Sequence, residues 1–284
     1  MARGIVPRQP AKTGRHERAR VERSLTKTGG LRPGRPGQRP GSTPVKRSAK
    51  STLARASKGY NPLAPERIAE ILKRLDELYP DATCVLTHKS AWELLVATIL
   101  SAQSTDVNVN RVTPELFRKY PTVEDFAALT PEQLEPDVRS TGFFRNKSKS
   151  VVGAAKKIVS EFGGQVPDDI DKLLTLPGVA RKTANVVLGT WFRKAEGVVV
   201  DTHVTRIARR LELTKQADAP KIERDLMQVI PREKWILFSH QIIWHGRTLC
   251  MARRPKCVDC ALENICHAGD KTWSTVEMHK NAKV

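Results

Sequence analysis

The stretch LLTLPGVARKTAN at residues 173–185 decides how the chain folds. Its apolar start is typical of the end of a helix, which Pro177 would terminate. Gly178 then permits a tight turn that other residues rarely adopt, and residues 181–185 can begin a second helix. The N–H groups at the start of a helix lack partners within it, and the helix dipole favours an anion such as phosphate there. The stretch therefore predicts two helices joined by a tight turn, with an anion-binding end.

Helical periodicity continues through the chain from Pro62 onward. Apolar residues between 68 and 78 recur at three- and four-residue steps, and the more apolar segment 91–100 predicts a buried helix. Thr122 and Thr130 each precede a side-chain acceptor by three residues, which is typical of helix starts. Further helices are predicted at 147–162, 167–175, 181–193, 202–211, 219–230 and 233–247. The β-branched run at 198–200 is too short to seed a sheet, so the predicted fold class is all-α.

Positive charge is concentrated at the N-terminus. The 284 residues include 49 Lys and Arg against 30 Asp and Glu, which gives a net charge of +19. Residues 1–60 hold 16 of the basic residues and two of the acidic ones, so they carry +14 and the remainder carries +5. This segment has too little apolar surface to offset its ordering entropy, so we expect a disordered basic tail. It could solubilise the protein, bind DNA without sequence preference, or act as an organellar transit peptide.

The net charge favours a polyanionic partner, with nucleic acid ahead of an acidic membrane surface. No apolar run reaches about 18 residues, so no transmembrane helix is expected. The first 60 residues also lack the apolar core of a secretory signal. Five cysteines, four of them close together, argue against a secreted disulfide scaffold and for a metal in a reducing compartment.

Four cysteines with the spacing C-x6-C-x2-C-x5-C form the most distinctive cluster. They are Cys250, Cys257, Cys260 and Cys266. Four thiolates on one short loop can hold either a tetrahedral zinc ion or a cubane iron–sulfur cluster, and the spacing does not separate the two. Within this loop, Arg253, Arg254 and Lys256 would present cations suited to phosphate contacts. The fifth cysteine, Cys84, is expected to be a buried small apolar residue.

Taken together, these motifs closely resemble the endonuclease III family of DNA glycosylases in the helix-hairpin-helix superfamily. The resemblance covers about residues 62–270. It is carried by LPGVARKTA at 176–184, VDTH at 200–203 and the cysteine loop, with LSAQSTD at 100–106 and STGFF at 140–144 in support.

The resemblance implies two helical lobes that hold DNA across a cleft, and a [4Fe–4S] cluster rather than zinc. A six-helix barrel containing the hairpin would span residues 85–195. The cluster lobe would combine residues 61–84 with residues 196–270. The tails at 1–60 and 271–284 would flank these lobes.

The resemblance also assigns Lys182 as the nucleophile and Asp201 as its catalytic partner. An amine that attacks C1′ of a deoxyribose expels the base and forms a Schiff base, which permits β-elimination of the 3′ phosphate. The attacking amine must be neutral, a form that desolvation, Arg181 or helix-end N–H groups would favour. Asp201 could accept a proton and stabilise positive charge on the sugar. Without the resemblance, Asp201 is more simply interpreted as a helix N-cap.

A damaged base must leave the helical stack to reach such a site, and the vacated space needs a filler. The resemblance matches Gln103 and Phe143 to that task, although the family commonly has Leu where Phe143 stands. It assigns contacts with the DNA backbone to the hairpin residues Pro177, Gly178, Val179, Ala180 and Arg181. Many members have a second Gly where Ala180 stands, so its methyl group would hinder close approach of a phosphate. His203, His240 and His245 are expected to be packed or hydrogen-bonded structural residues.

We therefore expect a bifunctional DNA N-glycosylase and AP lyase of base excision repair. It would remove oxidised pyrimidines from duplex DNA and cleave the strand 3′ to the abasic site. Its partner would be double-stranded DNA with damaged bases or abasic sites, and the protein would be a monomer without membrane association. It would act in the bacterial cytoplasm at the nucleoid, or in the nucleus or an organelle of a eukaryote.

Three alternatives remain at this point. An adenine glycosylase acting on mismatches is a rival, but its relatives usually have Ser where Lys182 stands and carry a further C-terminal domain. A pyrimidine-dimer glycosylase would share the architecture. From a different class, a non-catalytic DNA-binding module would use the hairpin, the basic loop and the tail, although the pair Lys182 and Asp201 speaks against it.

Overall fold

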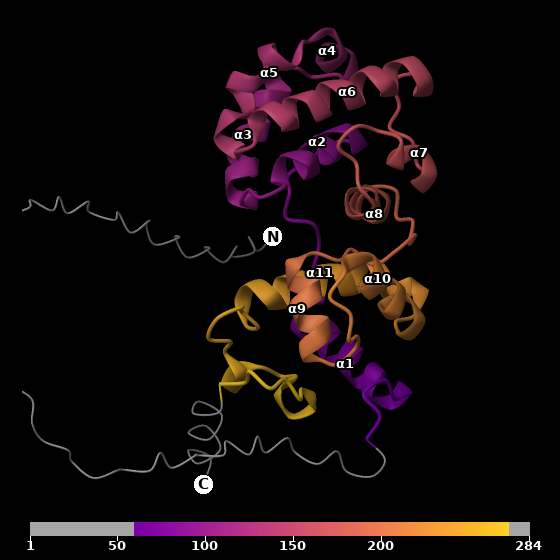
Figure 1. The fold of residues 1–284 in the computed structure, drawn as a ribbon, viewed down its shortest axis with the longest axis vertical. Helices are drawn as coiled ribbons and strands as arrows, with labels where there is room; N and C mark the ends of the chain where they lie inside the picture. The colour runs from indigo at the N-terminus through magenta and orange to yellow at the C-terminus, as the bar shows by residue number, and fades with distance from the viewer. Residues whose placement is uncertain (1–59, 273–284) are drawn as a thin grey trace, which may run out of the picture. The chain divides into compact units, whose positions relative to one another are not determined.

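Residues 60–272, the part of the chain that this computed structural model describes, form eleven α-helices joined by loops and short 3₁₀ turns. No strand occurs within this range. The prediction of an all-α fold is confirmed. Figure 1 shows the helices in two groups, each of which encloses its own apolar core.

The first group consists of seven consecutive helices around a central one. They are α2 (Ala91–Ser101), α3 (Asp106–Lys119), α4 (Val123–Ala128), α5 (Pro131–Val138), α6 (Phe144–Phe162), α7 (Ile170–Leu174) and α8 (Arg181–Thr190). Helix α2 is apolar along nearly its whole length and buries every residue from Leu94 to Leu100. The neighbouring helices are amphipathic: each turns an apolar side toward the core and carries its charged residues on the exposed side.

The second group combines one helix from the start of the described chain with three from its later half. They are α1 (Pro65–Leu78), α9 (Thr202–Arg210), α10 (Ala219–Val229) and α11 (Trp235–Thr248). In Figure 1, the indigo α1 lies among these orange and yellow helices. Asp76 of α1 accepts hydrogen bonds from Lys234 and Gln241 at 2.8 and 2.9 Å, which ties α1 to α11.

Local capping signals set several helix starts. Thr122 and Thr130 each accept a hydrogen bond from the backbone three residues on, and Asp125 and Gln133 complete reciprocal capping boxes. Pro131 occupies the first turn of α5, where its missing N–H costs nothing. The two predicted helix starts are therefore confirmed.

The helix limits differ from the sequence pattern in a few places. Helix α3 was not predicted, because Pro114 in its interior interrupts the expected helical pattern. Helix α6 begins at Phe144 rather than 147, and α7 is confined to Ile170–Leu174 because Asp169 caps its start. Residues 198–200 are buried and have no regular secondary structure. Val198 and Val200 pack in the second core, and the backbone N–H of Val199 donates to the Ser239 hydroxyl at 3.0 Å.

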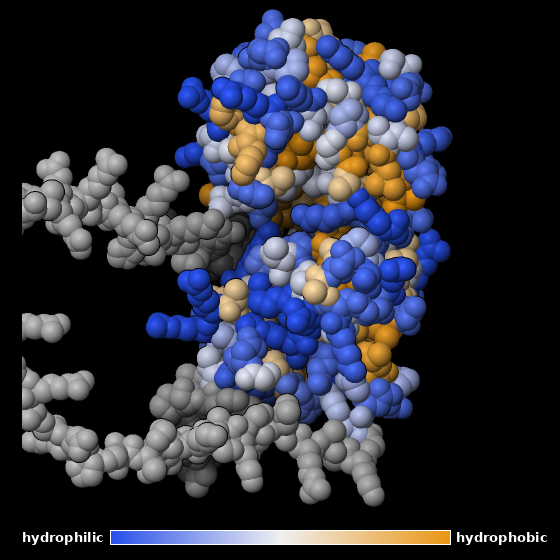
Figure 2. All heavy atoms as spheres, viewed as in Figure 1, coloured by the Kyte–Doolittle hydropathy of each residue, from blue (hydrophilic) through white to orange (hydrophobic). Residues whose placement is uncertain are grey.

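The expected tail at 1–60 and C-terminal tail at 271–284 lie outside the described residues, apart from Tyr60, Lys271 and Thr272. Tyr60 donates a hydrogen bond to Glu212 at 2.5 Å. None of the helices described is both long enough and apolar enough to cross a membrane. On the face in Figure 2, hydrophilic side chains predominate over α9 and α10, and apolar side chains show in patches over the first group.

Candidate functional site

The hairpin between α7 and α8 has buried apolar residues on its inner side and exposed residues at its tip. Leu176 and Val179 are buried, whereas Pro177, Gly178 and Ala180 are exposed. Gly178 has a φ of +77°, and a Cβ at this position would lie 2.4 Å from the Ser150 Cβ. Both the left-handed backbone and the close approach to α6 therefore require glycine. Because Val179 is buried, only the tip of the hairpin presents its surface outward.

The start of α8 offers backbone N–H groups without a side-chain cap. Ala180 is the N-cap residue and its side chain accepts no hydrogen bond. The first N–H groups of a helix have no acceptor within it, so those of α8 remain for an external partner. An anion is the natural partner, because the helix dipole is positive at this end.

Lys182 and Asp201 line the same cleft, which is formed by residues of both groups of helices. Lys182 lies in the first turn of α8, and Asp201 directly precedes α9. Around them lie Cys84, His240 and Arg247. Two residues that are 19 positions apart in the sequence thus line one cleft from the starts of two successive helices.

Asp201 is the N-cap of α9 as well as a residue of the cleft. Its Oδ1 accepts from the backbone N–H groups of His203 and Val204 at 2.7 and 2.8 Å. Among residues 60–272, Oδ2 accepts no hydrogen bond, so one carboxylate oxygen fixes the orientation and the other remains for chemistry. The N-cap interpretation and the catalytic one are therefore compatible.

Arg181 joins the two groups of helices. Its Nε donates to Glu223 of α10 at 2.8 Å, and Asn185 donates to the other oxygen of that carboxylate at 2.8 Å. Glu223 is buried, and a Cβ on Gly197 would lie 2.0 Å from its Oε1. We expected Arg181 to act on Lys182 as a neighbouring cation. Its charge is instead largely compensated by Glu223, because the two groups form an ion pair.

A second ion pair crosses the cleft beside the site. Arg247 of α11 donates to Asp106 of α3 at 2.5 Å, and both residues line the cleft with Lys182. Sequence reasoning missed this pair, since its members are 141 positions apart. The Arg247–Asp106 pair therefore lines the cleft, and it connects the same two groups of helices as the Arg181–Glu223 pair.

Gln103 and Phe143 lie at the tips of two loops, one after α2 and one before α6. Both have left-handed backbone conformations, with φ of 52° and 48°, and both side chains are exposed, Phe143 by 63%. Non-glycine residues rarely adopt this conformation, and where they do it often marks a functional site. The side-chain amide of Asn108 joins the loops by donating to Ser104 Oγ and the Ser140 carbonyl at 3.2 and 2.9 Å.

The four predicted metal ligands surround one small cavity. Cys250, Cys257, Cys260 and Cys266 all line it. Within residues 60–272, no three His, Cys, Asp or Glu side chains lie close enough together to hold a single metal ion. Burial and the three neighbouring cysteines raise the pKa of Cys260 to about 12. A thiol must lose its proton to bind a metal, so a bound metal or cluster would be what holds these side chains as thiolates.

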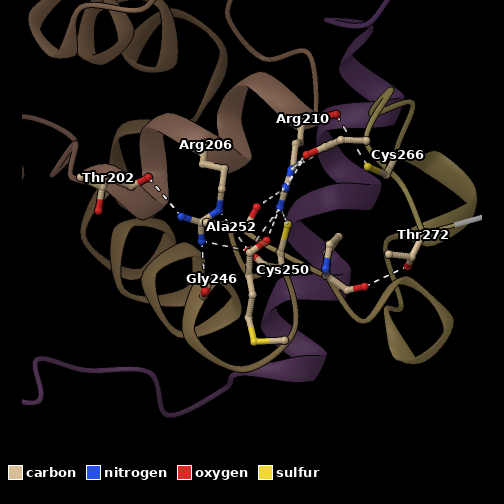
Figure 3. Close-up of polar contacts among 11 residues, drawn as sticks. Thr202, Arg206, Arg210, Gly246, Cys250, Ala252, Cys266 and Thr272 are labelled. Carbon is tan, nitrogen blue, oxygen red and sulfur yellow. Dashed lines mark hydrogen bonds and ion pairs between the residues drawn. The ribbon is translucent and has the colours of Figure 1, made fainter. Parts of the chain in front are cut away.

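Two arginines of α9 hold the first cysteine in place (Figure 3). Arg206 donates to the Cys250 carbonyl at 2.9 Å and to the Gly246 carbonyl at 3.0 Å. Arg210 donates to Cys250 Sγ at 3.2 Å and to the Met251 carbonyl at 2.7 Å. The C-terminal part of helix α9 therefore contacts the cysteine loop, and the N-terminal end of α9 lies at the cleft. The cations Arg253, Arg254 and Lys256 are exposed on the same loop.

Among the residues expected to be structural, His240 and Cys84 line the cleft, and His245 lines the cavity of the cysteines. Burial lowers the pKa of His240 to about 4, with Arg193 and Arg247 adding to the effect. His203 Nδ1 accepts a hydrogen bond from Arg206 at 3.2 Å, and burial lowers the pKa of His203 as well. His245 contacts the Tyr79 hydroxyl at 3.1 Å. Cys84 packs against the first core and also lines the cleft.

Comparison with known proteins shows first the superfamily and then the family to which the chain belongs. Residues 96–232 match the family model described as HhH-GPD superfamily base excision DNA repair protein. Endonuclease III from Synechocystis sp. is 54% identical over 201 residues, which cover 71% of this chain and 92% of that protein. The chain therefore belongs to the endonuclease III family.

Solved structures agree with this placement. A trapped endonuclease III–DNA covalent intermediate is 41% identical, with a TM-score of 0.68 over 72% of this chain and 95% of that one. A non-covalent endonuclease III–DNA complex is also 41% identical, with a TM-score of 0.70 over 74% of this chain and 98% of that one.

Proposed function

We propose that this base excision repair enzyme is a bifunctional DNA N-glycosylase and AP lyase whose nucleophile is Lys182. The observation that carries the proposal is that Lys182 and Asp201 line one cleft at the starts of two helices. The substrates would be oxidised pyrimidines in duplex DNA. In a bacterium, the enzyme would act on the chromosome.

The proposed reaction needs an amine and a carboxylate in these positions. The neutral Lys182 amine attacks C1′ of the damaged nucleotide, and the C1′–N bond breaks as the base leaves with its electron pair. The attached nitrogen then loses one proton, and its lone pair opens the ring as the ring oxygen takes up a proton. The resulting protonated Schiff base, which keeps the other N–H, draws electrons so that the C2′ proton and the 3′ phosphate can leave. Asp201 stabilises the positive charge that develops on the sugar, and its Oδ2 can accept a proton.

DNA binding would use three surfaces around the cleft. The uncapped N–H groups of α8 suit a backbone phosphate, with the hairpin tip at Pro177, Gly178 and Ala180 providing the close approach. Gln103 and Phe143 would fill the space that the extruded nucleotide leaves, since an apolar ring can intercalate between bases. The exposed cations Arg253, Arg254 and Lys256 would contact further phosphates. The buried Val179 would support the turn.

The four cysteines would hold a [4Fe–4S] cluster. A single zinc ion with bonds of about 2.3 Å requires its four sulfurs to lie close together, whereas a cubane spreads its ligands more widely. The arrangement around one cavity, without a compact set for one ion, fits the larger group. The cluster would order the basic loop and supply no step of the reaction. Iron and acid-labile sulfide in equal amounts, without stoichiometric zinc, would support this assignment, and zinc alone would refute it.

Substrate range is the test of the proposed activity. A panel of matched duplexes would contain an oxidised pyrimidine, an abasic site, an A/G mismatch or a pyrimidine dimer. Cleavage of the first two, with little on the others, supports the proposal. Preference for the mismatch or the dimer would favour the rival glycosylases, and binding without cleavage of any duplex would favour a DNA-binding module.

A further inference from the structure

The amine of Lys147 is buried where the loops that carry Gln103 and Phe143 meet. Lys147 lies on α6, is 5% exposed, and donates hydrogen bonds to the carbonyls of Leu100 and Thr141 at 2.8 Å each. Its backbone N–H bonds to the Phe143 carbonyl, one helical turn earlier. A helical side chain points toward the N-terminus of its helix, so this position directs the amine back into the loop before α6.

The Leu100 carbonyl belongs to the last turn of α2, where no intrahelical donors remain. The other carbonyls of this turn have local donors: the Ser101 hydroxyl and the amides of Ala102 and Ser104. The Leu100 carbonyl is bonded by Lys147 instead, and a positive charge at a helix C-terminus interacts favourably with the dipole. Lys147 thus completes α2 and simultaneously binds the loop on the other side.

The two bonded carbonyls are close in sequence to the two exposed tips. Leu100 precedes Gln103 by three residues, and Thr141 precedes Phe143 by two. Both tips have left-handed backbones that persist only where the surrounding structure enforces them. Asn108 provides a second link between the same loops, through Ser104 and Ser140.

We propose that Lys147 is a positioning residue that fixes these two loops against each other, so that Gln103 and Phe143 enter the duplex together. This inference rests on the proposed function, in which those side chains fill the vacated space. Lys147 is not among the residues that line the cleft with Lys182 and Asp201. Its effect should therefore depend on whether the substrate has a base stack to open.

Protonation does not interrupt this role. Burial lowers the pKa of Lys147 to about 8. A charged ammonium has three N–H donors and a neutral amine has two, and either number suffices for two carbonyls. The positioning effect is accordingly expected on both sides of that pKa.

The test compares Lys147→Met with Lys149→Met, which removes an exposed lysine from the same helix. Borohydride trapping rates are measured on an abasic site in duplex DNA and on the same strand alone. In Lys147→Met, duplex trapping should fall at least about tenfold while single-strand trapping changes less than about twofold, and Lys149→Met should change neither. Equal losses on both substrates, or no loss on either, would overturn the proposal.

A second readout reports the loops directly. With 2-aminopurine opposite an abasic analogue, wild type should raise the fluorescence by unstacking the base, and Lys147→Met should lose most of that rise. If Lys147→Met does not fold, Asn108→Ala cuts the other link and should give the same split between duplex and single strand. A full fluorescence rise in the folded variant contradicts the inference. Absence of trapping by wild type on either substrate would instead refute the proposed lyase function.

Discussion

Gly178 shows at the level of one residue how the hairpin depends on backbone freedom. Gly178→Ala would place a methyl group in a left-handed backbone and against Ser150. We expect the free energy of unfolding to fall by more than the approximately 1–2 kcal/mol of the left-handed conformation alone, together with weaker DNA binding. Chemical denaturation and a binding isotherm measure both effects.

Gly163→Ala is the matched control for this substitution. Gly163 also has a positive φ, of +57°, but nothing lies within 4 Å of the added methyl group. It should therefore lose only the conformational contribution and retain DNA binding. Equal destabilisation by the two variants would show that the contact with Ser150 is unimportant.

His240, which lines the cleft, should make the stability of the protein depend on pH. Burial lowers its folded pKa to about 4, while an unfolded histidine titrates near 6.5. The unfolded chain thus binds more protons between these values, so stability is fully present above pH 6.5 and declines as the pH falls toward 4. One such histidine contributes up to about 3 kcal/mol of this decline. His240→Gln should flatten the profile of unfolding free energy between pH 6.5 and 4.5, and an unchanged slope would contradict this assignment.

Helix α9 combines a capping role and a proposed chemical role in Asp201. Asn caps a helix about as well as Asp, whereas Ala does not. Asp201→Asn should therefore keep the melting temperature and lower the single-turnover cleavage rate by about 100-fold or more. Asp201→Ala should lose the same activity and, in addition, about 1 kcal/mol of stability. Activity that follows stability across the two variants would mean that Asp201 is only a cap.

Elements with local signals were predictable from the sequence. The capping residues Thr122 and Thr130 predicted the starts of α4 and α5, and the Pro177–Gly178 turn predicted the hairpin, because these signals act within a few residues. Helix α3 was not predicted because Pro114 in its interior interrupts the local pattern, and the burial of Val109, Thr113 and Leu116 on its inner face is known only from the fold.

Charged residues that serve the site through distant partners were also missed. Lys147 has the same residue type as the exposed Lys149 two positions later, and only the loops from α2 and before α6 make it a buried donor. Glu223 likewise acquires its role from Arg181 and Asn185 of another helix. Periodicity gives the face of a helix, but it does not give the partner across a tertiary contact.

At the scale of the whole molecule, two ion pairs connect the groups of helices beside the cleft. In each pair, one partner comes from the first group of helices and the other from the second. The pairs are Arg181 with Glu223 and Asp106 with Arg247. Lys182 and Asp201 are likewise supplied by different helices. The geometry of the site therefore depends on how the two groups are held, and these ion pairs contribute to that.

The N-terminal charge should govern affinity for DNA rather than chemistry. Deleting residues 1–59 removes most of the net charge and retains Tyr60, which bonds to Glu212. We expect weaker binding to undamaged duplex and a slope of log affinity against log salt that is lower by about 0.9 for each phosphate that the deleted segment would have neutralised. Single-turnover cleavage at saturating enzyme should remain unchanged. An unaltered salt slope would leave the segment as a solubilising extension.

The central claim is that Lys182 forms the covalent bond to the sugar. Borohydride added during incubation with a thymine-glycol duplex reduces a Schiff base to a stable amine, and mass mapping of the digested adduct identifies the residue. The account predicts one adduct, on the peptide that contains Lys182, and its loss in Lys182→Gln. Absence of an adduct with wild type, or an adduct at another residue, would contradict it.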